Sequence, residues 1–206
     1  MDSVVGIDLS GLTSGARGHT VAAELFLETP LRLGERFIAP RLLRGDRLLV
    51  DWIEERRPRV VAIDAPLSLP HSVTCEVVGC ERCRPGSASY LARDVDRLAG
   101  GMPTVMLAAI AFRGMYLSRR LRTAGFEVIG VYPGAAYALW GLRGAPYEER
   151  ANFLASRVGG FAWSTRDEVD AVCAAAVAMD YIMGADAGVI AGQDGEIILP
   201  AGLRPA

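Results

Sequence analysis

The sequence contains no lysine. All 22 of its basic residues are arginine, and Asn152 and Gln193 are its only side-chain amides. Arginine suits bidentate contacts with phosphate, but we interpret the bias as the mark of a GC-rich or heat-adapted genome. The sequence also lacks an excess of charge, because 24 acidic residues oppose the arginines and leave a formal net charge of −2. The chain as a whole has no attraction for nucleic acid, so any site for a polyanion must be local.

Long apolar runs are absent as well. Although 51% of the residues are hydrophobic and the mean hydropathy is +0.24, no run approaches the ~18 to 20 residues that cross a membrane. Asp2 and Asp8 flank the short apolar run at the N-terminus, and no basic region precedes it as in a signal peptide. We therefore expect a cytoplasmic protein without a membrane partner. The 206 residues predict one domain, 1–206, with an irregular insertion at about 66–102.

Two apolar runs in the first third of the chain end in an aspartate. Residues 4–8 read Val-Val-Gly-Ile-Asp, and residues 60–64 read Val-Val-Ala-Ile-Asp. Near-continuous apolar runs of this length are typical of central strands that are covered on both faces. The amphipathic pattern of 44–57 predicts a helix between them, and a crossover through a helix makes the two strands parallel. Asp8 and Asp64 should then lie at the same edge of the sheet, where a divalent cation would relieve their repulsion.

The remaining patterns complete a mixed α/β sheet with flanking helices. Two extended segments, about 19–27 and 31–38, are separated by a turn at 28–30 and form an antiparallel three-strand meander with the first strand. A further buried strand is expected at 126–132, and a hairpin at 189–199 turns at Asp194-Gly195. The other predicted elements are a loop at 12–18 and helices at 103–123, 135–142, 146–158 and 166–183.

The last of these helices carries two acids in its first turn. Thr165 and Glu168 fit a capping box, and Asp167 and Asp170, three residues apart, project from one face. The helix dipole alone would favour acids at this place. From Ala171 onward, however, the helix is built of small residues that let it lie close to a sheet, which would turn Asp170 inward. Together with the two strand-end aspartates, these acids are the parts of a two-metal phosphodiester site.

The order of these motifs resembles the RNase H-like superfamily, whose Holliday-junction resolvases carry a similar Asp-x-x-Asp-Ala helix. More closely, the chain resembles the domain-of-unknown-function 429 family of predicted RNase H-like nucleases. The motifs that carry the resemblance are Gly6-Ile7-Asp8, Ala62-Ile63-Asp64-Ala65-Pro66, Val131-Tyr132-Pro133, Asp167-Glu168-Val169-Asp170-Ala171 and Gly195-Glu196-Ile197-Ile198-Leu199-Pro200.

This resemblance implies an RNase H-like fold and a nuclease that acts on DNA or RNA with Mg²⁺ or Mn²⁺. It implies Asp8, Asp64 and Asp170 as catalytic metal ligands, with Asp167 as an additional or alternative one. One position departs from the pattern. An acid often stands two residues before the Tyr/His-Pro pair in this family, and here that residue is Gly130. If that acid binds metal in other members of the family, this protein has one metal ligand fewer, and its nuclease activity is weak or lost.

The insertion contains a second set of metal-ligand side chains. His71, Cys75, Cys80 and Cys83 provide four soft ligands, enough for a closed tetrahedral zinc site. The alternatives are three free or partly buried thiols, or a disulfide. The fourth cysteine, Cys173, lies among alanines and is expected in the core.

Several polar residues are candidates for substrate contacts. Ser10 follows the first strand, and Arg82, Arg84, Arg93 and Arg97 flank the insertion. If the insertion covers the carboxylate edge, these arginines could hold substrate phosphates. Arg113, Arg119, Arg120 and Arg122, on the helix that follows the insertion, are expected to form a solvated charged face instead.

Three functions are compatible with the sequence. The leading hypothesis is a metal-dependent nuclease. The second is an RNase H-like module with weak or no catalytic activity that serves in binding or in the assembly of a complex. The third takes residues 6–11 and the following Ser/Thr/Gly loop as the phosphate loop of an actin-like or sugar-kinase-like ATPase, although such enzymes close two domains around the nucleotide. The oligomeric state is open, and a homodimer is one of the candidates.

Overall fold

The computed structural model describes residues 2–10, 20–28, 32–38, 45–87, 90–101, 104–184 and 187–201. Several sequence predictions fall wholly or partly outside the described residues. They are the loop at 12–18, the turn at 28–30, and the starts of the predicted strands and helices at His19, Leu31, Arg44 and Pro103.

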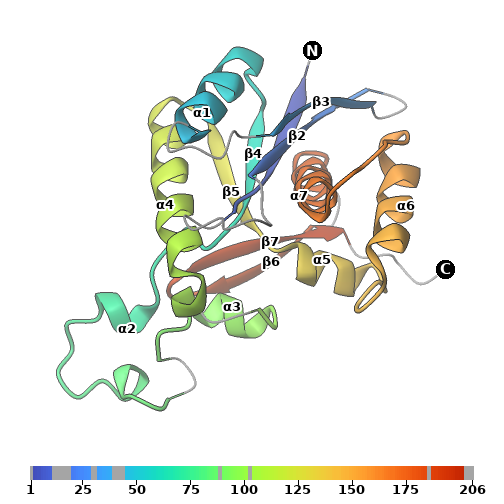
Figure 1. The fold of residues 1–206 in the computed structure, drawn as a ribbon. Coiled ribbons are helices and arrows are strands. Elements are labelled where there is room, and N and C mark those ends of the chain that lie inside the picture. The colour runs from blue at the N-terminus through green and yellow to red at the C-terminus, as the bar shows by residue number, and fades with distance from the viewer. Residues whose placement is uncertain are drawn as a thin grey trace.

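A seven-stranded sheet forms the centre of the molecule, in the order β3-β2-β1-β4-β5-β7-β6 (Figure 1). β2 pairs antiparallel with both β1 and β3, which confirms the predicted meander. β1, β4 and β5 run parallel, which confirms the predicted crossover connections and the mixed sheet. The strands are β1 (Ser3–Asp8), β2 (Val21–Phe26), β3 (Arg32–Ile38), β4 (Val60–Asp64), β5 (Glu127–Val131), β6 (Ala187–Gly192) and β7 (Gly195–Ala201).

The helices agree closely with the predicted spans outside the insertion. The predicted helix at 103–123 is the exception, because it begins as a 3₁₀ turn and continues as an α-helix from Ala108. None of the described helices is long and apolar enough to cross a membrane. The helical elements are α1 (Gly45–Arg56), α2 (His71–Thr74), η1 (Glu81–Cys83), α3 (Asp94–Leu98), η2 (Thr104–Leu107), α4 (Ala108–Thr123), α5 (Pro133–Leu139), α6 (Tyr147–Val158) and α7 (Arg166–Ile182).

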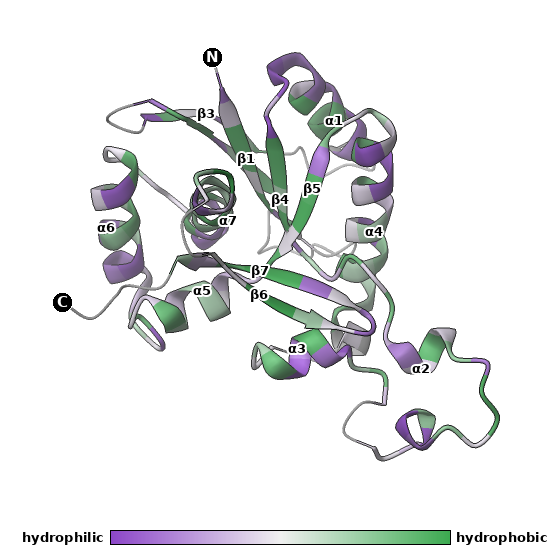
Figure 2. Ribbon diagram, turned by 180° about the vertical axis from the view of Figure 1, so that it is seen from behind, coloured by the Kyte–Doolittle hydropathy of each residue, from purple (hydrophilic) through white to green (hydrophobic). Residues whose placement is uncertain are grey.

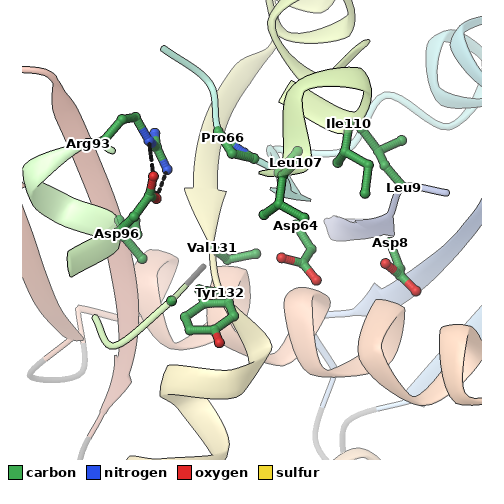
Figure 3. A pocket seen from close by; sticks show the side chains of 13 residues that line it. Asp8, Leu9, Asp64, Pro66, Arg93, Asp96, Leu107, Ile110, Val131 and Tyr132 are labelled. Atoms are coloured by element: carbon green, nitrogen blue, oxygen red, sulfur yellow. Dashed lines mark hydrogen bonds and ion pairs between the residues drawn. The ribbon is translucent and has the colours of Figure 1, made fainter. Parts of the chain in front are cut away.

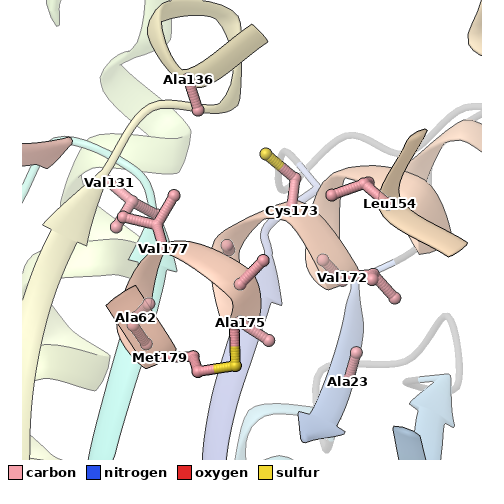
Figure 4. Close-up of a cluster of buried hydrophobic side chains, with 14 of the residues drawn as sticks. Ala23, Ala62, Val131, Ala136, Leu154, Val172, Cys173, Ala175, Val177 and Met179 are labelled. Atoms are coloured by element: carbon pink, nitrogen blue, oxygen red, sulfur yellow. The ribbon is translucent and has the colours of Figure 1, made fainter. Parts of the chain in front are cut away.

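Helices cover both faces of the sheet, and each face has its own hydrophobic core. α1 and α4 pack on one face against side chains such as Val5 and Ile7. α7 lies on the other face, with α5 and α6 outside it (Figure 1). There, α7 packs against Val4 and Ala62 among others (Figure 4). Consequently the central strands are hydrophobic along most of their length (Figure 2), as their near-continuous apolar runs predict.

α7 touches the sheet most closely at Gly6 in β1. A Cβ atom at this position would lie 2.1 Å from the backbone nitrogen of Ala175 and 2.3 Å from the carbonyl oxygen of Ala171. Only glycine opposite a stretch of alanines allows two backbones to approach this far. The small residues of α7 therefore have the role that the sequence predicts for them, and they bring the first turn of α7 close to the end of β1.

The C-terminal hairpin extends the sheet, which the sequence did not predict. β6 and β7 form the expected hairpin, but β7 also pairs parallel with β5 through Val131 and Ile198. Only this one residue pair joins the two strands in the sheet, and so short a ladder leaves no pattern in the sequence. Figure 1 shows the hairpin crossing the sheet near the carboxyl end of β5 and next to α3.

The insertion at 66–102 consists of two parts rather than one cover over the carboxylate edge. α3 and the residues around it lie against the β6–β7 hairpin. Residues 71–87, which include α2 and η1 and are called the projecting lobe below, extend away from the body of the protein (Figure 1). Pro66 and the α3 part therefore stand near the strand ends, and the projecting lobe does not.

Candidate functional site

A cleft of about 190 Å³ opens at the carboxyl ends of β1, β4 and β5 (Figure 3). Asp8 and Asp64 line it from the strand ends, and Tyr132 lines it from the residue after β5. Leu107 and Ile110 form an apolar wall at the start of α4. The carboxyl ends of parallel strands are where α/β proteins commonly bind ligands, and this opening is called the carboxylate cleft below.

Asp8 and Asp64 are directly opposite each other in the parallel register of β1 and β4. Both side chains point the same way, toward α7 (Figure 3). Because residues alternate between the faces of a strand, each aspartate shares the α7 face with the residue two positions before it, Gly6 or Ala62. The sequence prediction that the two acids meet at one edge is thereby confirmed.

The two strand-end carboxylates lie close together where the surrounding protein reduces their solvation. Burial raises the pKa of Asp8, and the nearby carboxylates of Asp64, Asp170 and Asp167 raise it further. Burial and the charge of Asp170 raise the pKa of Asp64 to about 8. Such a site favours either protonated acids or a bound cation that offsets the negative charge.

Asp170 reaches this site from the first turn of α7. The turn is fixed at its start, because the Thr165 hydroxyl accepts a hydrogen bond from the Glu168 backbone at 3.2 Å and caps the helix as predicted. Buried Glu168 also forms an ion pair with Arg36 on β3. Asp167 lies in the same turn and contributes to the raised pKa values of Asp8 and Asp170. Of the four predicted aspartates, Asp8 and Asp64 line the cleft, whereas Asp170 and Asp167 lie close enough to raise the pKa of Asp8 without being among its lining residues.

Two tyrosines hold the Asp170 carboxylate. The hydroxyl of Tyr137 donates to Oδ1 at 2.8 Å, and that of Tyr147 donates to Oδ2 at 3.0 Å. The Arg150 guanidinium stacks on both rings, 4.6 Å and 4.8 Å from their centroids. Burial raises the pKa of Asp170, while the tyrosine hydrogen bonds and Arg150 oppose that rise. These groups therefore favour the ionised form of a carboxylate that burial would otherwise neutralise.

The four aspartates do not form one tight ligand set. Among the described residues, the one group of at least three His, Cys, Asp or Glu side chains whose ligand atoms lie close together, all within 4.8 Å, is in the projecting lobe. Carboxylate oxygens are nonetheless the ligands that Mg²⁺ and Mn²⁺ prefer, and Mg²⁺ usually retains several waters. The chemistry of the aspartate donors therefore suits such an ion, although their spacing does not form a ready ligand set.

Gly130 lies on the other face of the sheet. A Cβ atom there would point at Leu67, 3.5 Å away, and at the carbonyl oxygen of Glu196 at 3.4 Å. The neighbours of Gly130 in β5, Ile129 and Val131, face α7. An acid at position 130 would therefore point away from Asp8 and Asp64, so the glycine does not remove a ligand from this cleft.

The four candidate arginines of the insertion form ion pairs within it. Arg93 lines the cleft, but it is buried, and its Nε lies 3.0 Å and 3.1 Å from the oxygens of Asp96. Arg82 pairs with Asp94 and contacts Gln193. Arg84 lies 3.6 Å from Glu81, and Arg97 lies 3.9 Å from Asp94. Arg82 and Arg93 would have to leave these partners to contact a substrate, whereas Arg84 and Arg97 are 71% and 52% exposed and their ion pairs leave them accessible.

Ser10 is held in place by its neighbours. Its backbone nitrogen donates to the Thr20 hydroxyl at 3.2 Å, and its carbonyl oxygen accepts from Arg113 at 2.7 Å. Arg113 also pairs with Asp46, and its side chain is only 11% exposed. The prediction of a solvated face was therefore wrong for Arg113, which fixes the chain just after Asp8.

Several residues around Asp170 and the cleft have no recognisable pattern in the sequence. Tyr137 and Tyr147 are on two different helices and reach Asp170 only through the fold. Asp96 lines the cleft beside Arg93 and accepts a hydrogen bond from Thr104 at 2.5 Å. None of these residues stands at a recurring spacing from the strand-end aspartates, so no sequence pattern could have selected them.

Tyr137→Phe is expected to lower the free energy of unfolding by about 1–2 kcal/mol, because it leaves a buried carboxylate oxygen without a donor. Tyr181→Phe is the matched control, since Tyr181 donates to Glu127 at an exposed site and its loss should cost less than about 0.5 kcal/mol. Urea denaturation of the two variants measures both effects. Equal losses would contradict the role given to Tyr137.

The raised pKa of Asp64 predicts an unusual dependence of stability on pH. Its value of about 8 in the folded protein lies above the value of about 3.9 in an unfolded chain. Between these values the folded state binds more protons, so the free energy of unfolding should fall as the pH rises from about 4 to about 8 and then level off. Asp64→Asn should weaken this fall. Urea denaturation across that range, without added Mg²⁺ or Mn²⁺, tests it, and an unchanged slope in the variant would contradict it.

The fold is similar to that of known Holliday junction resolvases. The structure of RuvC from Thermus thermophilus aligns with a TM-score of 0.53 and 16% identity, over 95% of this chain and 99% of that one. RuvC from T. thermophilus in complex with a Holliday junction substrate aligns with a TM-score of 0.53 and 14% identity, over 96% of this chain and all of that one. No protein-family model and no curated protein matches the sequence. At these identities the likeness shows an RNase H-like fold.

Proposed function

We propose that the protein is a divalent-metal-dependent nuclease that hydrolyses phosphodiester bonds of nucleic acid in the carboxylate cleft. The observation that carries this proposal is the register of β1 and β4, which places Asp8 opposite Asp64 on the face where α7 brings Asp170. The motif order supports a place beside the domain-of-unknown-function 429 family within the RNase H-like proteins. Because the two structural neighbours are resolvases, branched DNA is the first substrate class to test.

In this proposal, different residues bind the metal, orient Asp170 and shield the cleft from water. Asp8, Asp64 and Asp170 would hold Mg²⁺ or Mn²⁺, with Asp167 as a further ligand, and the bound metal would supply an activated water and charge stabilisation at the leaving oxygen. Tyr137 and Tyr147 fix the orientation of Asp170 and favour its ionised form. Leu107 and Ile110 limit water at one side of the cleft, which strengthens the electrostatic interactions inside it.

The test of this proposal is a cleavage assay with labelled substrates. Single-stranded DNA, duplex DNA, a four-way DNA junction and the corresponding RNAs are incubated with the protein and Mg²⁺ or Mn²⁺. Cleavage of at least one substrate is expected, and it should stop when the metal is omitted. Absence of cleavage on every substrate with both metals would contradict the proposal.

A second candidate function is a nucleic-acid-binding module without cleavage. The looser arrangement of the aspartates and the pairing of Arg93 with Asp96 favour it, because neither a tight ligand set nor an unpaired phosphate-binding arginine is seen among the described residues lining the cleft. Binding of the four-way junction, unchanged by Asp8→Asn and without cleavage in Mn²⁺, would support this alternative.

A further inference from the structure

The projecting lobe has almost no core of its own. Neither α2 nor η1 contains a buried residue. Its larger apolar side chains point outward, since Val73 and Val77 are more than half exposed and Val78 is fully exposed. A segment of this size without buried apolar surface cannot offset its conformational entropy by packing, and small folds of this kind are commonly held by a metal or disulfides.

Four metal-ligand side chains meet inside this lobe. Two hydrogen-bonded turns bring them together. In α2 the backbone nitrogen of Cys75 donates to the carbonyl of His71 at 2.9 Å, and around η1 that of Cys83 donates to the carbonyl of Cys80 at 3.1 Å. Each turn thereby presents two ligands. The ligand atoms of His71, Cys75, Cys80 and Cys83, called the His–Cys cluster below, all lie within 4.8 Å of one another.

The geometry of the cluster fits a tetrahedral ion. Zinc bonds of about 2.3 Å to sulfur and about 2.0 Å to nitrogen, at a tetrahedral angle, separate the two ligand atoms by about 3.5 Å. The Sγ atom of Cys80 lies 3.8 Å from Nε2 of His71. The three cysteines are free thiols in the structure. Three sulfurs and one imidazole make a closed ligand set of the structural kind, with no position left for water or substrate.

The lobe is connected to the carboxylate cleft through Asp194, at the turn between β6 and β7. The carboxylate of Asp194 accepts from the backbone nitrogen of His71 at 3.4 Å and from that of Asp94, the first residue of α3, at 2.9 Å and 3.0 Å. Its carbonyl oxygen accepts from Ser68, and the Ser68 hydroxyl in turn accepts from Arg93 at 3.2 Å. The same turn thus holds one end of the lobe and the Arg93–Asp96 side of the cleft.

We infer that the His–Cys cluster binds one structural zinc ion, which folds the projecting lobe and, through Asp194, fixes the α3 side of the carboxylate cleft. The ion takes no part in phosphodiester chemistry, because the lobe extends away from Asp8 and Asp64 (Figure 1). The zinc site therefore does not depend on the proposed nuclease activity, and either can be wrong without the other.

Metal content and thiol chemistry test the site itself. Protein produced without a histidine tag should contain one zinc per chain by mass spectrometry of the metal. Cys173→Ala is the matched control and should keep this content, since Cys173 lies buried in α7, whereas Cys80→Ser and Cys83→Ser should lose it. Replacement of zinc by Co²⁺ in the wild type should give the absorption of tetrahedral cobalt with thiolate ligands.

Three results would overturn the site. They are wild-type protein that neither contains zinc nor gives the tetrahedral cobalt spectrum, equal zinc loss in Cys173→Ala, and a disulfide between two cysteines of the cluster, seen as two missing thiols before reduction. The cobalt titration uses unmodified protein, so a folding defect in the serine variants leaves the inference testable.

Hydrogen exchange tests the link to the cleft. Removal of zinc should speed amide exchange at least about tenfold in residues 71–87 and also in residues 90–101, while α7 stays protected. Asp194→Ala should keep its zinc and show faster exchange in 90–101 and at the amide of His71, while the rest of 71–87 keeps its wild-type exchange. If zinc removal affects residues 71–87 alone, the ion folds the lobe and the proposed link through Asp194 is wrong.

Discussion

Asp8→Asn is expected to reduce metal-dependent cleavage at least about 10³-fold, because losing a ligand removes several kcal/mol of transition-state stabilisation and each 1.36 kcal/mol is tenfold in rate. Asparagine has the size of aspartate but cannot offset the charge of a divalent cation. The loss should appear in the rate with saturating substrate, since the substrate itself is bound by other groups. Single-turnover cleavage of the best substrate from the screen measures it.

Folding and catalysis can be separated in this variant. Burial and three neighbouring carboxylates disfavour the ionised form of Asp8, so Asp8→Asn should leave the metal-free protein as stable as the wild type or more stable at neutral pH. Asp51→Asn is the control, because Asp51 is an exposed acid on α1 whose loss should leave cleavage unchanged. Cleavage that Asp8→Asn retains would show that the activity arises elsewhere.

Gly6→Ala is expected to destabilise the protein by about 3 kcal/mol or more, the upper range for overpacking a core. The added methyl group would meet backbone atoms of α7 at 2.1 Å and 2.3 Å, and backbone cannot move aside as the end of a long side chain can. α7 must shift away from β1, which also moves Asp170 relative to Asp8. The variant should therefore lose both stability and affinity for Mn²⁺, as measured by urea denaturation and calorimetry.

Gly130→Ala is the matched control for this variant. It makes the same change in another buried central strand, so both variants have the same effect on the unfolded chain. The nearest atoms to its new methyl group lie at 3.4 Å and 3.5 Å, which is ordinary contact. We expect a change within about 1 kcal/mol. If the two variants were equally stable, the close approach of α7 to β1 would not be the reason for the glycine.

The sequence predicted those parts of the site that follow from local patterns. The apolar runs ending in Asp8 and Asp64 and the helix between them were enough to predict that these two acids meet at one edge, and the small residues of α7 predicted its close approach to the sheet. The position of Gly130 could not be judged until the register of β5 showed that residue 130 points to the opposite face. A sequence motif shows which residue stands at a position, but the pleat and register of the strand determine the face of the sheet to which its side chain points.

The other differences involve contacts between segments far apart in the sequence. Tyr137 and Tyr147 reach Asp170 from α5 and α6, and β7 joins β5 through a single residue pair. The ligands of the His–Cys cluster were recognisable from their spacing, but the projection of their lobe was not. Arg93 was chosen for its charge, whereas the fold buries it against Asp96. A charge pattern in the sequence identifies candidate phosphate-binding residues, but only the tertiary structure shows whether they already form ion pairs within the protein.

The central claim is that Asp8, Asp64 and Asp170 bind divalent metal together. The most direct measurement is the anomalous scattering of Mn²⁺ in crystals of the protein soaked with this ion. We predict strong anomalous peaks in the carboxylate cleft, within bonding distance of Asp8 and Asp64 and with Asp170 or Asp167 completing the ligand set, and loss of these peaks in Asp8→Asn crystals. A cleft without manganese in fully soaked wild-type crystals would contradict the claim.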